Sequence, residues 1–131
     1  MEEKYLTTIK EHLIKKISPY LIIVYGSGAR GKLRENSDLD IAFLSEHRFS
    51  DYELFMYGQE LASLLDRDVD LVDLEKASTV FQAQVLSTGK AIYCSDPIKK
   101  MFFHMFTFKK YARLNEERKY ILKKLEERGS L

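Results

Sequence analysis

Residues 21–44 read LIIVYGSGARGKLRENSDLDIAFL, two apolar segments joined by a loop of glycine, serine and charged residues. The first segment, residues 20–25, is a continuous run of β-branched and aromatic side chains that ends at a glycine, which is typical of a strand buried on both faces. The second segment, residues 39–44, overlaps the Asp-x-Asp pair Asp38 and Asp40 and predicts another strand. The polar loop is therefore expected to join two buried strands.

This loop resembles three phosphate-binding patterns, and the surrounding sequence separates them. Residues 26–31 match G-x-G-x-x-G, and residues 26–33 match the P-loop pattern except at Leu33, which has no hydroxyl for magnesium. Both patterns require a helix directly after the loop, but only residues 32–38 separate Gly31 from the next strand. That length is too short for a crossover helix, so the third interpretation, which combines the Gly-Ser turn with the Asp pair, is favoured.

The Gly-Ser turn and the Asp pair together predict a site for a metal-bound polyphosphate. Backbone N–H groups near Gly26 and Ser27, with the Ser27 hydroxyl, are expected to hold the β and γ phosphates. Positions two apart on a strand face the same side, so Asp38 and Asp40 are expected about 6.6 Å apart at Cα. Both could then reach divalent metal ions about 4 Å apart. The alternative is that Asp38 only forms a turn or cap and Asp40 is a solvated edge residue.

A third carboxylate is expected from a strand predicted over residues 68–74. Asp70 lies inside that strand between apolar neighbours, where an unpaired carboxylate would be costly without metal. We therefore expect Asp70 to be a metal ligand and the general base that accepts a proton from the attacking hydroxyl. Asp68 is expected to be solvated, and Asp73 is expected to cap the end of the strand.

Arg30 is the basic residue of the loop that we expect on the triphosphate, where its guanidinium would stabilise charge during transfer. A surface ion pair with Glu35 or Asp38 is the alternative. The three histidines lie in separate segments without ligand spacing, and Cys94 has no evident base partner, so structural or surface roles are expected for them.

Periodicity and breaker residues predict the remaining elements. Helices are expected over residues 2–17, 50–65, 77–86 and 97–128, and a short final strand over residues 91–94. Ser50 and Glu53 have the spacing of a capping box at the start of the second helix.

The composition indicates one ordinary globular domain. The chain has 131 residues, of which 45% are hydrophobic and 31% charged. Its apolar runs are far shorter than the roughly 20 residues of a membrane span, and its N-terminus lacks the pattern of a signal peptide. The single cysteine cannot form an internal disulfide. A cytoplasmic location without membrane contact is therefore expected.

Charge divides the chain into an acidic and a basic part. Residues 1–96 carry 11 Lys/Arg and 16 Asp/Glu, whereas residues 97–131 carry 10 and 4. We expect residues 1–96 to form the catalytic core and residues 97–131 to be a C-terminal helical extension of the same domain, roughly 45 Å long. The first half of this extension is apolar around most of its circumference, which predicts either contact with a partner or second subunit, or packing on its own sheet. The sequence shows no recognisable nucleic-acid-binding module, so direct nucleic-acid binding is not expected.

The pattern of Gly26-Ser27, ten residues and Asp38-x-Asp40, with VDLVDL at residues 69–74, resembles the nucleotidyltransferase superfamily of DNA polymerase β type, specifically its minimal nucleotidyltransferases. The resemblance covers residues 21–74 well and residues 85–96 more loosely. It implies an α/β fold, with a small mixed β-sheet flanked by helices. It also implies that Asp38, Asp40 and Asp70 hold two Mg²⁺ ions and that Ser27 contacts phosphate.

Minimal members of this superfamily are often antitoxins of an all-helical HEPN-domain ribonuclease toxin, and some silence the toxin by adding AMP from ATP to one of its tyrosines. The resemblance therefore implies a magnesium-dependent nucleotidyltransferase that uses ATP, with a HEPN toxin as partner. One alternative is an antitoxin that only binds and whose chemistry is dormant, although the intact carboxylates argue against it. Another is a small-molecule adenylyltransferase, which usually carries more chain to enclose its acceptor.

Overall fold

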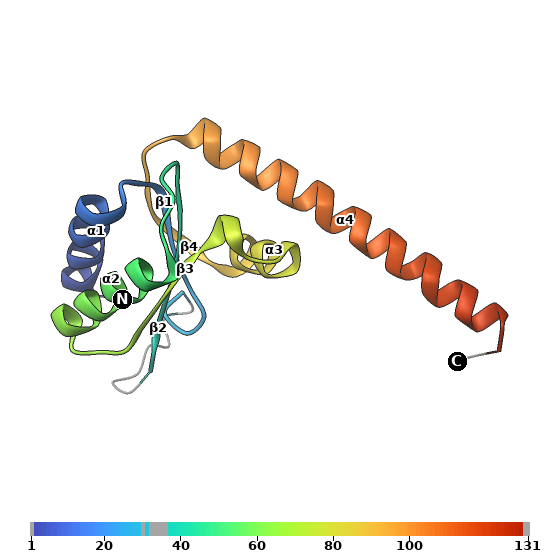
Figure 1. Cartoon of the computed structure of the whole chain (residues 1–131), viewed down its shortest axis with the longest axis horizontal. Coiled ribbons are helices and arrows are strands. Elements are labelled where there is room, and N and C mark those ends of the chain that lie inside the picture. The colour runs from blue at the N-terminus through green and yellow to red at the C-terminus, as the bar shows by residue number, and fades with distance from the viewer. Residues whose placement is uncertain (1, 30, 32–36, 130–131) are drawn as a thin grey trace.

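The computed structural model describes residues 2–29, 31 and 37–129 (Figure 1). Along the chain, the elements are α1 (Glu3–Ile17), β1 (Pro19–Tyr25), β2 (Leu39–Ser45), α2 (Asp51–Leu65), β3 (Val69–Asp73), the 3-10 helix η1 (Leu74–Lys76), α3 (Thr79–Thr88), β4 (Lys90–Cys94) and α4 (Pro97–Glu127). This order confirms the mixed α/β class and every helix and strand predicted above, with ends that move by one or two residues.

The strands form one mixed sheet in the order β3-β2-β1-β4. Strand β1 runs antiparallel to both of its neighbours, whereas β2 and β3 are parallel and are connected through α2. Because β1 and β2 are antiparallel and consecutive, the glycine loop joins the two strands of a hairpin. The dinucleotide and P-loop patterns need a parallel strand after a crossover helix, so the hairpin excludes both.

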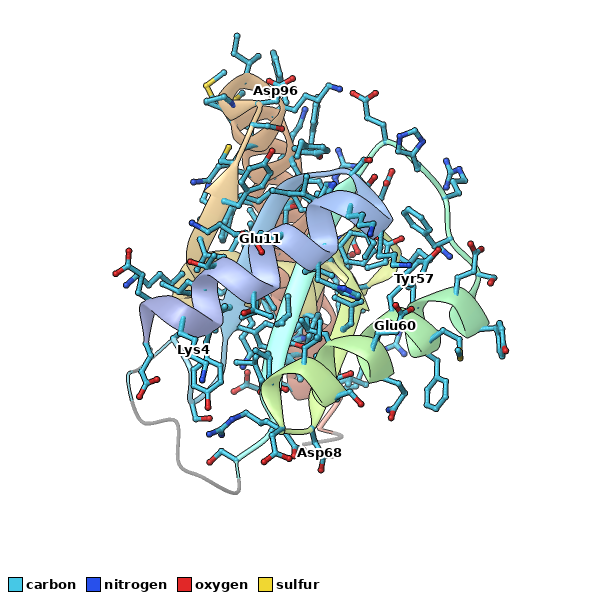
Figure 2. The ribbon with its side chains drawn as sticks, turned by 90° about the vertical axis from the view of Figure 1, so that its left-hand side faces the viewer. Lys4, Glu11, Tyr57, Glu60, Asp68 and Asp96 are labelled. Carbon is cyan, nitrogen blue, oxygen red and sulfur yellow. The ribbon has the colours of Figure 1, made fainter. Side chains whose placement is uncertain are left out.

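Each face of the sheet buries a separate hydrophobic cluster. Helices α1 and α2 cover one face, as Figure 2 shows from their side, and α3 lies on the other (Figure 1). The first cluster contains Ile22, Val24, Leu39, Ile41 and Phe43 with residues of α1 and α2. The second contains residues of the opposite strand parity, among them Ile23, Ala42 and Leu44, with Val85 of α3. Strand β1 is therefore buried on both faces, as its apolar sequence predicts.

Local signals explain where the helices begin and end. The Ser50 side chain accepts a hydrogen bond from the Glu53 N–H, and the Glu53 carboxylate accepts one from the Ser50 N–H, both at 3.1 Å, which confirms the capping box of α2. Helix α1 ends at Ser18 in the left-handed conformation, with φ of 51°. Gly89 directly follows α3. A Cβ at this position would collide with the side chain of Ile23, so only glycine fits there.

Helix α4 is one continuous helix of 31 residues that extends away from the body of the molecule (Figure 1). Thr107 is its only buried residue. Phe103 reaches the second hydrophobic cluster, but many large apolar side chains of α4 are exposed: Ile98, Met101, Phe102, Met105, Phe106, Leu114, Tyr120, Ile121 and Leu122. The first half therefore packs on its own domain along a narrow stripe and leaves most of its apolar surface open. No helix within the described residues is long and apolar enough to cross a membrane.

Candidate active site

Three polar side chains stand in a row across adjacent strands. Tyr25 at the end of β1 is the register partner of Asp40 in β2, and Asp40 is the register partner of Asp70 in β3. Register partners in neighbouring strands project from the same face of the sheet, with Cβ atoms about 5 Å apart. Leu39 is only 1% exposed and belongs to the α1–α2 cluster, so Asp40 projects from the opposite face, on the side of α3.

The glycine turn packs directly on the Asp40 carboxylate. Gly26 has a φ of +67°, and a Cβ placed on it would lie 2.5 Å from Oδ2 of Asp40. Only glycine accommodates both the conformation and the contact. Ser27 follows in the same turn, and further along the Gly31 N–H donates to the Gly28 carbonyl at 3.3 Å. The predicted phosphate-binding residues Gly26 and Ser27 thus begin beside one of the predicted metal ligands.

The carboxylates of this region repel one another. Burial raises the pKa of Asp40, and the nearby charges of Asp70 and Asp38 raise it further. Burial also raises the pKa of Tyr25, with additional contributions from Asp70 and Asp40. The Tyr25 phenol therefore stays protonated, and a bound cation would relieve the repulsion among the three acids.

Asp70 occupies the predicted position but not the predicted environment. Its side chain is exposed, whereas Asp40 is partly buried, so the expectation that Asp70 would be buried between apolar neighbours is wrong. The reason is that β3 is an edge strand of the sheet. The expected cap at Asp73 is confirmed, since its side chain accepts a hydrogen bond from the Glu75 N–H at 3.1 Å. Asp68 is exposed, as predicted.

The donor atoms of the site suit magnesium bound together with a nucleotide. Within residues 2–29, 31 and 37–129, no group of three or more His, Cys, Asp and Glu side chains is arranged to hold an ion by itself. Mg²⁺ in nucleotide sites is commonly held by one or two carboxylates plus phosphate oxygens. Asp40 and Asp70, in register on neighbouring strands, provide two such carboxylates, and the turn at Gly26 lies against the first of them. The residues therefore fit the ion.

Two neighbours of the site were not predicted from the sequence. The ring of Tyr25 packs edge-on against Phe81 of α3, with ring centres 5.6 Å apart. Nη1 of Arg67 donates a hydrogen bond to the Ser37 carbonyl at 2.8 Å and so holds the chain directly before Asp38. The position of Tyr25 before Gly26 was a usable signal, but nothing local links Arg67 to a residue thirty positions earlier. Arg30, predicted on the triphosphate, lies outside the described residues.

Comparison with known proteins gives the class of this site. Residues 7–98 match the family described as Polymerase beta, Nucleotidyltransferase. The match spans the hairpin, the Asp pair and Asp70. The chain belongs to this nucleotidyltransferase family.

Comparison with individual proteins gives more specific relatives within this family. The chain is 36% identical over 121 residues to the protein adenylyltransferase MntA of Shewanella oneidensis, which covers 92% of this chain and 84% of MntA. It is similar to a chain in a crystal structure of a toxin–antitoxin with AMP-PNP, with a TM-score of 0.82, 35% identity and coverage of 92% of this chain and 98% of that one. It also resembles a chain in the structure of a tri-AMPylated Shewanella oneidensis HEPN toxin in complex with an MNT antitoxin, with a TM-score of 0.79, 32% identity and coverage of 96% and 99%.

Proposed function

We propose that this chain transfers AMP from ATP to a hydroxyl group of a HEPN-domain toxin and thereby acts as an antitoxin. The observation that carries the proposal is the alignment of Asp40 with Asp70 in register, with the Gly26 turn packed on Asp40. The names of its relatives support the substrates: one is a protein adenylyltransferase, and another is an antitoxin bound to an AMPylated HEPN toxin.

In this proposal each site residue has a distinct part. Asp38, Asp40 and Asp70 would hold the metal, two Mg²⁺ ions in the family pattern, and the metal would neutralise the negative charge that develops during transfer. Backbone N–H groups at Gly26 and Ser27, together with Arg30, bind the β and γ phosphates. An acceptor oxygen attacks the α-phosphorus in line, and pyrophosphate leaves.

Asp70 is the carboxylate best placed to meet the acceptor. It is exposed at the edge of the sheet, whereas Asp40 lies between two strands under the glycine turn. A protein substrate can therefore approach Asp70 from the open side, and Asp70 can accept the proton of its hydroxyl group.

Helix α4 supplies the partner contact in this proposal. Residues 97–131 extend the catalytic core of residues 1–96, and the apolar side chains of the first half of α4 remain exposed on an otherwise basic helix. Exposed apolar patches of this kind commonly mark interaction surfaces, and a protein partner is the occupant in this proposal. A small-molecule acceptor would not require them.

We expect the neighbouring gene to encode a HEPN-domain protein, and mass spectrometry of that protein tests the transfer. After incubation with this chain, Mg²⁺ and ATP, we expect that protein to gain the mass of AMP on a hydroxyl-bearing residue. Asp38→Asn, Asp40→Asn and Asp70→Asn should each abolish the gain. Asp68→Asn, which changes an exposed carboxylate directly before β3, should keep it. If the Asn variants of the three site residues still neutralise the toxin fully, the chain is an antitoxin by binding alone.

A further inference from the structure

Strand β3 has an unpaired edge. Within the described residues it pairs only with β2, and Asp70 is the second of its five residues. The Leu39 N–H donates to the Asp68 carbonyl at 2.8 Å. This hydrogen bond shows which residues of β3 direct their backbone N–H and C=O groups toward β2 and which direct them away from it. The backbone groups of Asp70 point toward β2, whereas those of Val69, Leu71 and Asp73 point to the open side. An edge with free backbone groups is a template for another strand.

A groove of about 400 Å³ runs along this edge. All five residues of β3 line one side, and Leu54, Phe55, Gly58 and Gln59 of α2 line the other. Gly58 brings the helix close to the strand, because a Cβ on it would lie only 3.7 Å from the Cβ of Leu71. Phe55 is 62% exposed and forms an apolar wall of the groove. Figure 2 shows α2 ending just before Asp68, where the chain turns into β3.

We propose that the segment of the partner protein that carries the acceptor hydroxyl lies outside its helices and binds in this groove as an extended strand added to β3. The inference rests on the proposed function and specifies how the acceptor is recognised. Backbone hydrogen bonds from Val69, Leu71 and Asp73 would provide affinity, as in other cases of strand addition. The groove is therefore the acceptor-docking surface of the enzyme.

The register of the sheet explains why the acceptor, rather than another ligand, occupies this groove. Tyr25, Asp40 and Asp70 form a row across β1, β2 and β3. A strand added beside β3, about 4.8 Å away, continues that row with one side chain next to Asp70 on the same face. A hydroxyl-bearing residue at that position lies next to the group proposed to take its proton.

Alternation along a strand also predicts the sequence of the docked segment. Residues on either side of the acceptor residue would project to the opposite face, toward α2 and Phe55. The segment should therefore have a hydroxyl residue flanked by apolar residues. A second copy of this chain is a poor occupant, because its β3 edge carries the same Asp70 and Asp73 and would add negative charge beside these carboxylates.

A pair of matched substitutions on α2 tests the docking surface. Phe55 and Leu64 are both apolar and equally exposed, at 62% and 60%, but only Phe55 lines the groove. We expect Phe55→Glu to weaken binding of the neighbouring HEPN protein about tenfold or more and to raise the KM of AMP transfer for that protein. Leu64→Glu should change neither quantity, and both variants should bind an ATP analogue as the wild type does.

Hydrogen exchange provides an independent reading that needs no substitution. In the complex with the HEPN protein and a non-hydrolysable ATP analogue, the amides of Val69, Leu71 and Asp73 should exchange more slowly. The Val72 amide faces β2 and should change less. Unchanged exchange at the three edge amides would overturn the docking inference.

The outcomes separate this inference from the proposed function. If the wild type transfers AMP and Phe55→Glu behaves like Leu64→Glu, the docking inference falls and the proposed function stands. If size-exclusion chromatography shows that Phe55→Glu only converts a dimer of this chain to monomers, the groove is a self-association surface and the inference is again wrong. If the wild type transfers no AMP to the HEPN protein, the proposed function falls and the inference falls with it.

Discussion

Gly26 and Asp40 are coupled through a direct steric contact. Gly26 adopts a φ of +67°, and its missing side chain leaves the space that Oδ2 of Asp40 occupies. Gly31 has the same φ of +67°, but nothing lies within 4 Å of where its Cβ would be. Both glycines are therefore needed for the backbone conformation, but only Gly26 is also needed to leave space for the Asp40 carboxylate.

Replacing these glycines by alanine should have different effects on activity. Both Gly26→Ala and Gly31→Ala strain the backbone, at a cost of about 1–2 kcal/mol. Only Gly26→Ala also displaces the Asp40 carboxylate, so we expect it to abolish AMP transfer while Gly31→Ala retains most of it. Initial rates at saturating ATP, with folding checked by circular dichroism, measure the difference. Equal loss in both variants would show that loop conformation alone matters.

Asp40 should make the metal-free protein less stable at neutral pH. Its pKa is raised in the folded state by burial and by Asp70 and Asp38, so the folded protein loses stability as pH rises through that pKa. Asp40→Asn removes this cost. In EDTA at neutral pH the variant should therefore melt at a higher temperature than the wild type, and the difference should vanish below the usual pKa of aspartate, about 3.9.

With Mg²⁺ and nucleotide bound, the wild type should instead melt at a higher temperature than Asp40→Asn. The wild type gains stability from bound Mg²⁺ and nucleotide, whereas Asp40→Asn lacks a ligand and should gain little. Thermal melts with and without Mg²⁺ and ATP analogue measure both effects. A variant less stable than the wild type in EDTA at neutral pH would mean that a neighbouring group stabilises the ionised Asp40.

At the scale of elements, α2 determines the position of β3 and with it Asp70. It connects β2 to β3, packs on β3 at Gly58 and begins with the capping box of Ser50 and Glu53. The connection between α2 and β3 is short, so the position of this helix determines the position of Asp70 in the sheet.

Loss of the cap should destabilise the protein without damaging the site directly. Ser50→Ala removes the acceptor of the Glu53 N–H and should lower the free energy of unfolding by about 1 kcal/mol. Ser63→Ala, an exposed change within the same helix, should be neutral or slightly stabilising because alanine is the better helix former. Urea denaturation of both variants provides the comparison. A stable Ser50→Ala variant would show that tertiary packing alone holds the start of α2.

At the scale of the whole molecule, the body and α4 have separate tasks. The body contains both hydrophobic clusters and the row of Tyr25, Asp40 and Asp70, whereas α4 contributes one buried residue and a long exposed surface. The acidic body and the basic helix also differ in charge. The fold therefore has little need of the distal half of α4.

Truncation after Leu114 should consequently leave the body intact. Residues beyond this point include no buried residue among those described, and Figure 1 shows that part of α4 far from the sheet. We expect an unchanged melting temperature and unchanged binding of an ATP analogue. Affinity for the HEPN protein should remain if the first half of α4 forms the partner contact, which isothermal titration measures. A large fall in melting temperature would indicate that the distal helix folds back on the body.

Most elements of this fold could be predicted from the sequence because their signals are local. A strand of β-branched residues, a capping box or a glycine after a helix each acts over a few residues. The same holds for the Gly-Ser turn and for the alternation that places Leu39 on the opposite face from Asp40. The residue types of the candidate site could therefore be identified from the sequence, whereas their spatial arrangement could not.

Tertiary structure alone decided how these pieces meet. The order β3-β2-β1-β4 places Asp70 at an open edge, exposed where the local apolar neighbours predicted burial. The contact of Gly26 with Asp40, the hydrogen bond from Arg67 to Ser37 and the groove along β3 join segments distant in sequence. Such pairings depend on strand order and register, which are set by burial of the whole sheet between its helices rather than by any short stretch of residues.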